Sequence, residues 1–307
     1  MDITLIVPTH RYENPKLFEL TIQTATQNSS GYLREIVIVG EVPTKVQSTK
    51  VPIHIIMPDI SRVNIGSGYA RNLGAKHAHG QVLVFTDSHC YFHEGWDSAI
   101  IEGIREFGNC VISLRSYPIE LHEDEVIHRI ENAGLGCALT EDLEVVWVSK
   151  GADLGKYIAV PGNVTHCLAV PKHVFKETLI GFLPGYFEDV ELCFRLFRLG
   201  YDTLVTKDKY VGHYYKSEND PSWERTWKRN GTRLLFTVFN KVATTILDLD
   251  GERRRKALQK LEQQYGELYY RALQSAEKVI LPARKILEQK YVRTDEEYFQ
   301  IVKLCTT

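Results

Sequence analysis

Four consecutive apolar residues, Val82 to Phe85, lead into Asp87, Ser88 and His89. An apolar run this short, rich in β-branched and aromatic residues, predicts a strand buried on both faces of a parallel sheet. Ligands of open α/β sheets bind at the carboxyl ends of such strands, and side chains two apart in an extended segment point the same way. Asp87 and His89 could therefore hold one divalent metal ion. A polar turn in which Asp87 caps a neighbour explains the same residues about as well.

The bulk properties of the 307-residue chain fit a globular protein and exclude several classes. This length allows one large or two smaller domains. The formal net charge of −2 gives no basic field for nucleic acid. No stretch approaches the ~20 apolar residues of a transmembrane helix, and the N-terminus lacks the pattern of a signal peptide. Six scattered cysteines without a CxxC pair favour reduced thiols, so we expect a cytoplasmic protein without membrane insertion.

The first two thirds of the chain alternate short β-branched runs with helical patterns. This β-α-β alternation predicts an α/β fold with a doubly wound, mostly parallel sheet. Residues 118–160 are less regular and predict an edge hairpin with one strand at 145–148. The expected strands are 3–7, 35–39, 53–57, 81–85 and 110–114, and the expected helices are 15–27, 68–79, 95–107 and 188–199.

The composition changes near residue 219. Asn219–Ser222 is a turn and helix-start signal, so we predict two units, 1–218 and 219–307. The charged run Glu252–Lys256 is typical of a solvated helix face rather than of a nucleic-acid patch. The second unit predicts helices at about 221–240, 252–274, 275–291 and 294–304. Trp223, Trp227, Lys228, Arg229 and Arg233 could form a basic and aromatic face, although an amphipathic helix with solvated charges explains them better.

Several short motifs follow one another in a fixed order. They are Val7–Arg11, Val39–Glu41, Gly68–Ala75, Asp87–His89 with Glu94–Trp96, and Gly185–Leu196 followed by Val211–Tyr214. The ordered set resembles the nucleotide-sugar glycosyltransferases of the GT-A fold, and glycosyltransferase family 2 in particular. Asp87–Cys90, Glu94–Trp96 and Gly212–His213 are also similar to the polypeptide N-acetylgalactosaminyltransferases. The resemblance covers residues 3 to about 215.

The resemblance implies transfer from a UDP-sugar donor that is bound through a divalent cation, Mn²⁺ or Mg²⁺. Asp87, His89 and the distant His213 would be the metal ligands. A carboxylate suits Mn²⁺, and first-row metals tolerate imidazole better than Mg²⁺ does. The ion would act as a Lewis acid on the leaving diphosphate. For His213 the alternative is a surface histidine after a strand.

The same resemblance assigns donor-binding roles. Arg71 would approach the diphosphate, and a surface arginine on a helix is the competing interpretation. Gly68 would permit close backbone approach, although a plain turn explains it nearly as well. The uracil and ribose would lie at the ends of the first two strands, where Glu41 stands in place of the family's more usual Asp. The full donor set is Thr9, His10, Arg11, Glu41, Gly68, Arg71, Asp87, Ser88, Gly162 and Asn163.

Glu188 and Asp189 are the expected catalytic residues. In inverting family 2 members an Asp at this place is the general base on the acceptor. The polypeptide N-acetylgalactosaminyltransferases retain configuration and usually have Glu-Asn there. We predict inversion, with Asp189 as the base and Glu188 positioning the acceptor or the donor sugar. Two acids at a helix start also complement the helix dipole without any catalytic role, and Glu191 with Arg195 could be a stabilising pair.

Other functions fit the sequence less well. A nucleotidyltransferase would have a Gly-rich loop and a lysine after the first strand, but no glycine occurs before Gly31. The presence of the whole candidate set argues against a non-catalytic sugar-nucleotide-binding or scaffolding protein; the set is Asp87, His89, Glu188, Asp189 and His213. The acceptor could be a peptide, a glycan or a modified nucleobase. The C-terminal helices could bind the acceptor or form a homodimer.

Overall fold

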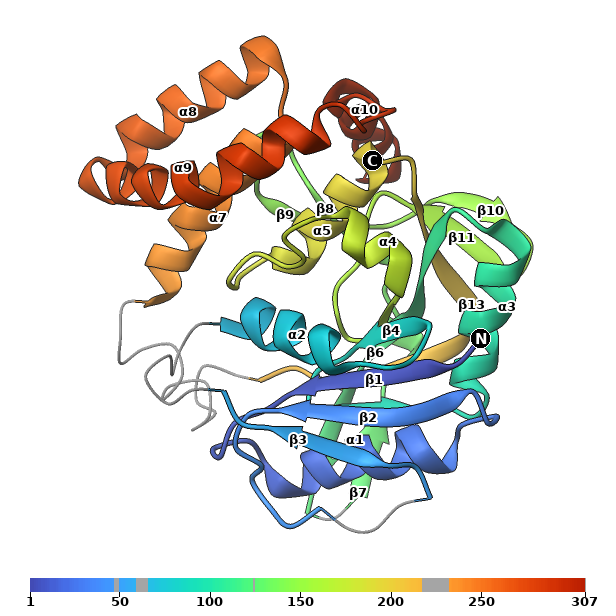
Figure 1. The fold of residues 1–307 in the computed structure, drawn as a ribbon. Helices are drawn as coiled ribbons and strands as arrows, with labels where there is room; N and C mark the ends of the chain where they lie inside the picture. The colour runs from blue at the N-terminus through green and yellow to red at the C-terminus, as the bar shows by residue number, and fades with distance from the viewer. Residues whose placement is uncertain (47–49, 59–65, 124, 217–231, 307) are drawn as a thin grey trace.

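The computed structural model describes residues 1–46, 50–58, 66–123, 125–216 and 232–306. One large sheet has helices on both faces, and a group of C-terminal helices lies beside it (Figure 1). Its strand order is β10-β11-β13-β6-β12-β4-β1-β2-β3, with β5 paired to β13 and β7 paired to β6. The strands are β1 (Ile3–Pro8), β2 (Leu33–Val39), β3 (Ile53–Ile56), β4 (Val82–Phe85), β5 (Cys90–Phe92), β6 (Cys110–His122), β7 (Glu125–His128), β10 (Ala152–Leu154), β11 (Tyr157–Val160), β12 (Leu168–Pro171) and β13 (Asp202–Tyr214).

The predicted α/β fold is confirmed, and the sheet is mixed. Strands β3, β2, β1 and β4 are parallel neighbours, as expected from the β-α-β alternation. Strand β12 runs antiparallel between β4 and β6. It follows β11 in the sequence, and residues 161–167 between the two strands contain no helix. Strand β6 extends beyond the predicted 110–114 because β13 and β7 pair with its second half.

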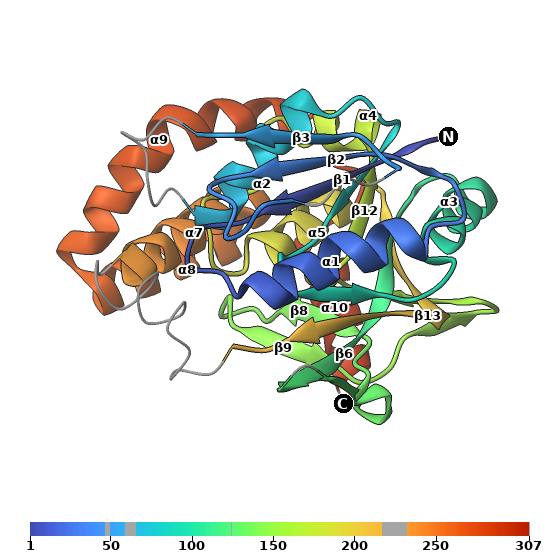
Figure 2. The ribbon, with the colours of Figure 1, turned by 90° about the horizontal axis from the view of Figure 1, so that it is seen from below.

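Alternate residues of the central strands enter different cores, so the sheet is buried on both faces as predicted. Leu5 and Val84 pack with α1 (Pro15–Gln27) and α3 (Trp96–Phe107) on one face. Ile6 and Phe85 pack on the other face with α2 (Gly66–His77), α4 (Lys172–Glu177) and α5 (Glu188–Arg198). Figure 2 shows α1 lying across the first of these faces. This alternation follows from the two-residue period of a strand.

The irregular region contains the predicted hairpin. Strands β8 (Gly136–Leu139) and β9 (Val145–Val148) form a separate two-stranded antiparallel sheet.

Trp96 is fully buried, and its indole N–H donates to the carbonyl of Ala25 at 3.0 Å. It is therefore a core residue.

The C-terminal helices are α7 (Thr232–Asp248), α8 (Gly251–Tyr265), α9 (Glu267–Leu287) and α10 (Asp295–Thr306). The helix boundary predicted at residue 274 is wrong. Helix α8 ends before Gly266, where the chain turns with a φ of 51°. Helix α10 packs its Tyr298 ring on Phe194 of α5, at a centroid distance of 4.0 Å. None of the described helices is both long and apolar enough to cross a membrane. The boundary predicted at residue 218 and the residues Trp223, Trp227, Lys228 and Arg229 lie outside the described residues.

A buried charge network joins α5 to α7. Arg195 Nη2 and Glu191 Oε2 lie 2.8 Å apart, and both side chains are fully buried, so this pair belongs to the core rather than to a solvated surface. Asp248, the last residue of α7, is also fully buried beside Glu191. Burial and the neighbouring Glu191 carboxylate raise the pKa of Asp248 well above its usual range, despite the positive charges of Arg195 and Arg198.

This raised pKa predicts a stability that falls as pH rises. The unfolded chain loses the Asp248 proton above its ordinary pKa of 3.8, while the folded chain retains it. The contribution of Asp248 protonation to the free energy of unfolding is complete below that pKa. It is lost as pH rises towards the folded-state pKa, by up to about 1.4 kcal/mol per pH unit. An Asp248→Asn variant lacks this pH-dependent contribution to stability because asparagine does not titrate. We expect urea unfolding between pH 5 and 7 to show the variant gaining stability over wild type as pH rises. A difference that is constant with pH would contradict the assignment.

Candidate metal and donor site

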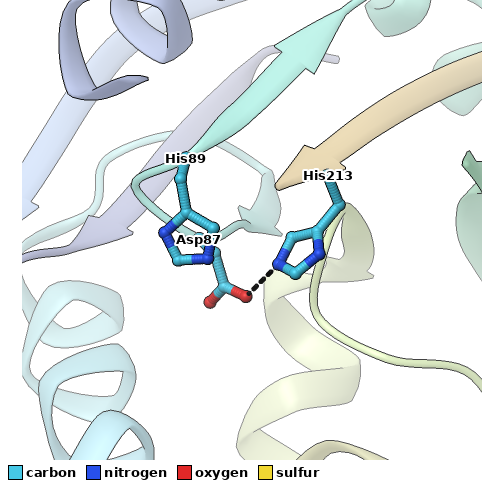
Figure 3. A group of neighbouring side chains, drawn as sticks. All are labelled: Asp87, His89 and His213. Carbon is cyan, nitrogen blue, oxygen red and sulfur yellow. Dashed lines mark hydrogen bonds and ion pairs between the residues drawn. The ribbon is translucent and has the colours of Figure 1, made fainter. Parts of the chain in front are cut away.

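Asp87, His89 and His213 meet at the carboxyl end of β4. Asp87 follows β4 and His89 directly precedes β5. Antiparallel pairing of β5 with β13 sets His213 opposite Cys90 and so brings it beside His89. The three side chains face one another in Figure 3, and Asp87 Oδ2 lies 3.3 Å from His213 Nε2. One ligand atom from each residue fits within a 4.8 Å span.

The electrostatics of this group suit a cation. Burial disfavours the charged form of Asp87, but hydrogen bonding from His213 and the charge of Arg71 outweigh it and hold the pKa well below its usual range. Burial lowers the pKa of His213 to about 4, despite Asp87. The group thus presents one carboxylate and a neutral imidazole from His213, which are ligands of first-row divalent metals.

Glu13 contacts the group formed by Asp87, His89 and His213, the candidate metal group. Glu13 was not identified from the sequence. It lies in the turn after β1, is buried, and its Oε2 lies 3.3 Å from His89 Nδ1. The same oxygen accepts from Ser88 Oγ at 2.7 Å and from Lys216 Nζ at 2.9 Å. Burial opposes ionisation, but His89 and Lys216 outweigh it and lower the pKa of Glu13. A carboxylate on Nδ1 leaves Nε2 of His89 to face a metal.

Glu13→Gln is expected to weaken Mn²⁺ binding by about 10–100-fold, because partners of a ligating histidine contribute that much to affinity. Titration calorimetry with Mn²⁺ measures it. Glu35→Gln is the matched control, because Glu35 is equally buried but lies at the start of β2, where it binds Thr4 and His79. Equal losses of affinity in the two variants would show a general effect of removing a buried acid.

His166 is a second supporting residue that the sequence did not indicate. Its ring stacks on His213 at a centroid distance of 3.6 Å and an interplanar angle of 13°. Its Nδ1 lies 2.7 Å from Ser116 Oγ. Burial and the nearby His213 lower the pKa of His166 well below its usual range. His166 is therefore a neutral ring that fixes the plane of His213.

Arg71 connects the metal group to the predicted acid pair. Its Nη2 donates to Asp87 Oδ1 at 2.8 Å and its Nη1 to Glu188 Oε1 at 2.6 Å, and its side chain is 3% exposed. The competing interpretation of a surface arginine is excluded. Ser67 also donates to Glu188 Oε1. Burial outweighs Arg71 and raises the pKa of Glu188.

Asp189, beside Glu188 at the start of α5, is less buried and differently bonded. Its Oδ2 accepts from the Thr165 backbone N–H at 2.9 Å and from Thr165 Oγ1 at 3.1 Å. Its Oδ1 accepts from the Val190 N–H at 2.9 Å. Because Thr165 precedes His166, Asp189 is also linked to the ring that stacks on His213.

The residues predicted to hold the nucleoside lie together at the ends of β1 and β2. Arg11 Nε lies 3.1 Å from Glu41 Oε2, and both side chains are exposed. His10 Nε2 lies 4.0 Å from Glu13 Oε2, and this contact joins the nucleoside residues to the metal group. The Thr9 N–H donates to the carbonyl of Val39 at 2.9 Å. The structure thus brings the four predicted residues to one edge of the sheet.

Four other predicted donor residues have protein contacts. Ser88 directs its hydroxyl to Glu13. A Cβ at Gly68 would lie 1.7 Å from the carbonyl oxygen of Leu183, so this glycine permits α2 to approach the 183–185 loop. Gly162 packs against Cys137 and Cys193. Asn163 Nδ2 donates to the carbonyl of Leu135 at 3.3 Å. Their predicted roles toward a donor stay predictions.

The chain is similar to known glycosyltransferases in part of its sequence. Residues 47–179 match the glycosyl transferase family 2. Polypeptide N-acetylgalactosaminyltransferase 15 of Mus musculus is 26% identical over 178 residues, which are 53% of this chain and 26% of that protein. Polypeptide N-acetylgalactosaminyltransferase 3 of Drosophila melanogaster is 25% identical over 209 residues, 60% of this chain and 30% of that protein. The chain thus spans about a quarter to a third of the length of these relatives.

Solved structures agree on the fold. GalNAc-T7 with UDP, GalNAc and Mn²⁺ superposes with a TM-score of 0.75 and 16% identity, covering 99% of this chain and 56% of that chain. The mannosyltransferase PcManGT of Pyrobaculum calidifontis, in complex with GDP-Man and Mn²⁺, has a TM-score of 0.50 and 17% identity over 94% of this chain and 78% of that chain. The chain therefore has a GT-A fold, and its residues 47–179 are similar to the glycosyl transferase family 2.

Proposed function

We propose that the chain transfers a sugar from a UDP-sugar to an acceptor hydroxyl and depends on a divalent cation, Mn²⁺ in preference to Mg²⁺. One observation carries the proposal. Asp87, His89 and His213 converge within 4.8 Å at the carboxyl end of a central strand, and Arg71 links this group to Glu188. Solved structures with the same fold contain UDP or GDP-Man together with Mn²⁺.

The residues present fit such an ion. One carboxylate and two imidazoles are ligands that Mn²⁺ accepts. The lowered pKa values of His213 and Glu13 favour a neutral imidazole and an ionised carboxylate, and both forms suit a nearby cation. When bound, the ion would neutralise the charge that develops on the leaving diphosphate. Arg71 adds a fixed positive charge beside Asp87, and Thr9, His10, Arg11 and Glu41 form the proposed edge for the uracil and ribose.

The proposed stereochemical course is inversion, with Asp189 as general base. Asp189 is suited to this role because Glu188 is committed to Arg71 and Ser67. Within the described residues, the donors that hold Asp189 are neutral, and its side chain is partly exposed. Retention is the second candidate, because the similar curated proteins are polypeptide N-acetylgalactosaminyltransferases. Those names also support a peptide hydroxyl as the acceptor. Cytoplasmic location and a homodimer through the C-terminal helices stay predictions.

The test uses the purified chain with UDP-glucose, UDP-galactose and their N-acetyl forms, each with Mn²⁺ and a Ser/Thr-containing peptide. We expect UDP release and glycosylated peptide with one donor, and loss of both on adding EDTA. The NMR coupling constant of the anomeric proton in the product distinguishes inversion from retention. Turnover that is insensitive to EDTA would overturn the metal dependence. UDP binding without turnover of any donor would indicate a binding protein.

A further inference from the structure

The backbone immediately before the acid pair has an unusual conformation. Tyr186 and Phe187 are consecutive non-glycine residues with φ values of 65° and 53°. The left-handed region is sparsely populated for residues with a Cβ, and such strain persists only where surrounding contacts hold it. Phe187 occupies the N-cap position of α5 without a capping hydrogen bond from its side chain. Other contacts must therefore fix this bend.

Asn240 of α7 makes those contacts from the C-terminal helices. Its side-chain Nδ2 donates to the carbonyl oxygens of Gly185 and Tyr186, the second at 2.8 Å. The residue is completely buried. From the same helix, the Arg233 guanidinium lies over the Tyr186 ring at 5.1 Å. Both contacts reach the bend from a part of the chain more than 45 residues away in the sequence.

The Asn240 side chain has one buried polar atom without a partner. Its Oδ1 is buried and has no hydrogen-bond partner within the part of the chain that the structure describes. A buried acceptor without a partner is unfavourable, so an apolar residue of similar size would suit the helix better if packing alone mattered. What the amide supplies is its NH₂ group, and both of its contacts are on the loop that leads to Glu188.

We propose that Asn240 is a positioning residue for catalysis: it locks the left-handed bend at Tyr186 and Phe187, and so places Glu188 and Asp189 relative to Arg71 and the metal group. The inference rests on the proposed function. The acid pair begins α5 directly after the bend, so a relaxed bend would displace both carboxyl groups. Asn240 then gives helix α7 a positioning role in addition to the predicted acceptor binding or dimerisation.

The test compares Asn240→Ala with Thr245→Val. Thr245 is equally buried on α7, and its hydroxyl donates within the helix, to the carbonyl of Lys241 at 2.7 Å. For Asn240→Ala we expect kcat to fall at least tenfold with the donor KM within threefold of wild type. We also expect amide hydrogen exchange in residues 183–189 to accelerate at least tenfold. Thr245→Val should change neither, even where the two variants melt at similar temperatures.

The proposal is overturned if kcat falls no further in Asn240→Ala than in Thr245→Val, or if exchange in 183–189 is unchanged. Asn240→Leu, which keeps the branched shape and the number of side-chain heavy atoms but has no hydrogen-bond donor, repeats the comparison if the alanine variant does not fold. Failure of the proposed function is a separate result. If the wild-type chain turns over no UDP-sugar, that function fails, whereas the exchange measurement still decides whether Asn240 holds the bend.

Discussion

Replacing Asp87 by asparagine is expected to lower Mn²⁺-dependent transfer by about a thousandfold. The substitution keeps the shape of the side chain but removes the charge that Arg71 and His213 face at 2.8 and 3.3 Å. It also removes the single carboxylate of the proposed ligand set. Lewis-acid stabilisation of a leaving group amounts to several kcal/mol, and each 1.36 kcal/mol is a factor of ten in rate. Initial rates with saturating donor, together with Mn²⁺ affinity by calorimetry, measure the effect.

Asp202→Asn is the matched control for this experiment. Asp202 also pairs with an arginine, Arg293, at 2.7 Å, but it lies at the opposite end of β13 from His213. This control should keep both Mn²⁺ affinity and turnover. An Asp87→Asn enzyme that retained EDTA-sensitive turnover within tenfold of wild type would refute Asp87 as a metal ligand.

Local patterns were enough to predict the strand and two of the proposed ligands. The apolar run 82–85 is buried throughout, and a strand that ends at Phe85 delivers Asp87 and His89 to one place. His213 lies 124 residues after His89, and only the resemblance to a family suggested that they meet. Their proximity is created by the pairing of β5 with β13, which no local pattern records.

The contacts around the proposed ligands could not be predicted for the same reason. Glu13 contacts His89 from 76 positions away, and Arg71 contacts Glu188 from 117 positions away. An acid in a turn after a strand has many possible roles, so Glu13 carried no distinguishing signal. Asn240 lies in a predicted amphipathic helix, and the apolar pattern around it does not show that this one amide is buried. Tertiary contacts, rather than residue types, give these positions their roles.

Asp189→Asn is expected to lower kcat by 10²–10⁴-fold while leaving the affinity for UDP and Mn²⁺ nearly unchanged. That range is the usual contribution of a positioned general base. The amide keeps one oxygen that can accept from Thr165 or Val190, so the start of α5 should remain in place. Single-turnover rates at saturating donor and acceptor isolate the chemical step from binding.

A purely structural role for Asp189 makes a different prediction. Asp189 holds Thr165, and Thr165 is followed by His166, whose ring stacks on His213. If this link were its function, Asp189→Asn would weaken Mn²⁺ and UDP binding together with turnover. Thr165→Val tests the link separately, because it removes the hydroxyl contact at 3.1 Å and leaves the carboxylate intact. A general base therefore requires Asp189→Asn to lose turnover at constant Mn²⁺ affinity, and Thr165→Val to lose far less turnover.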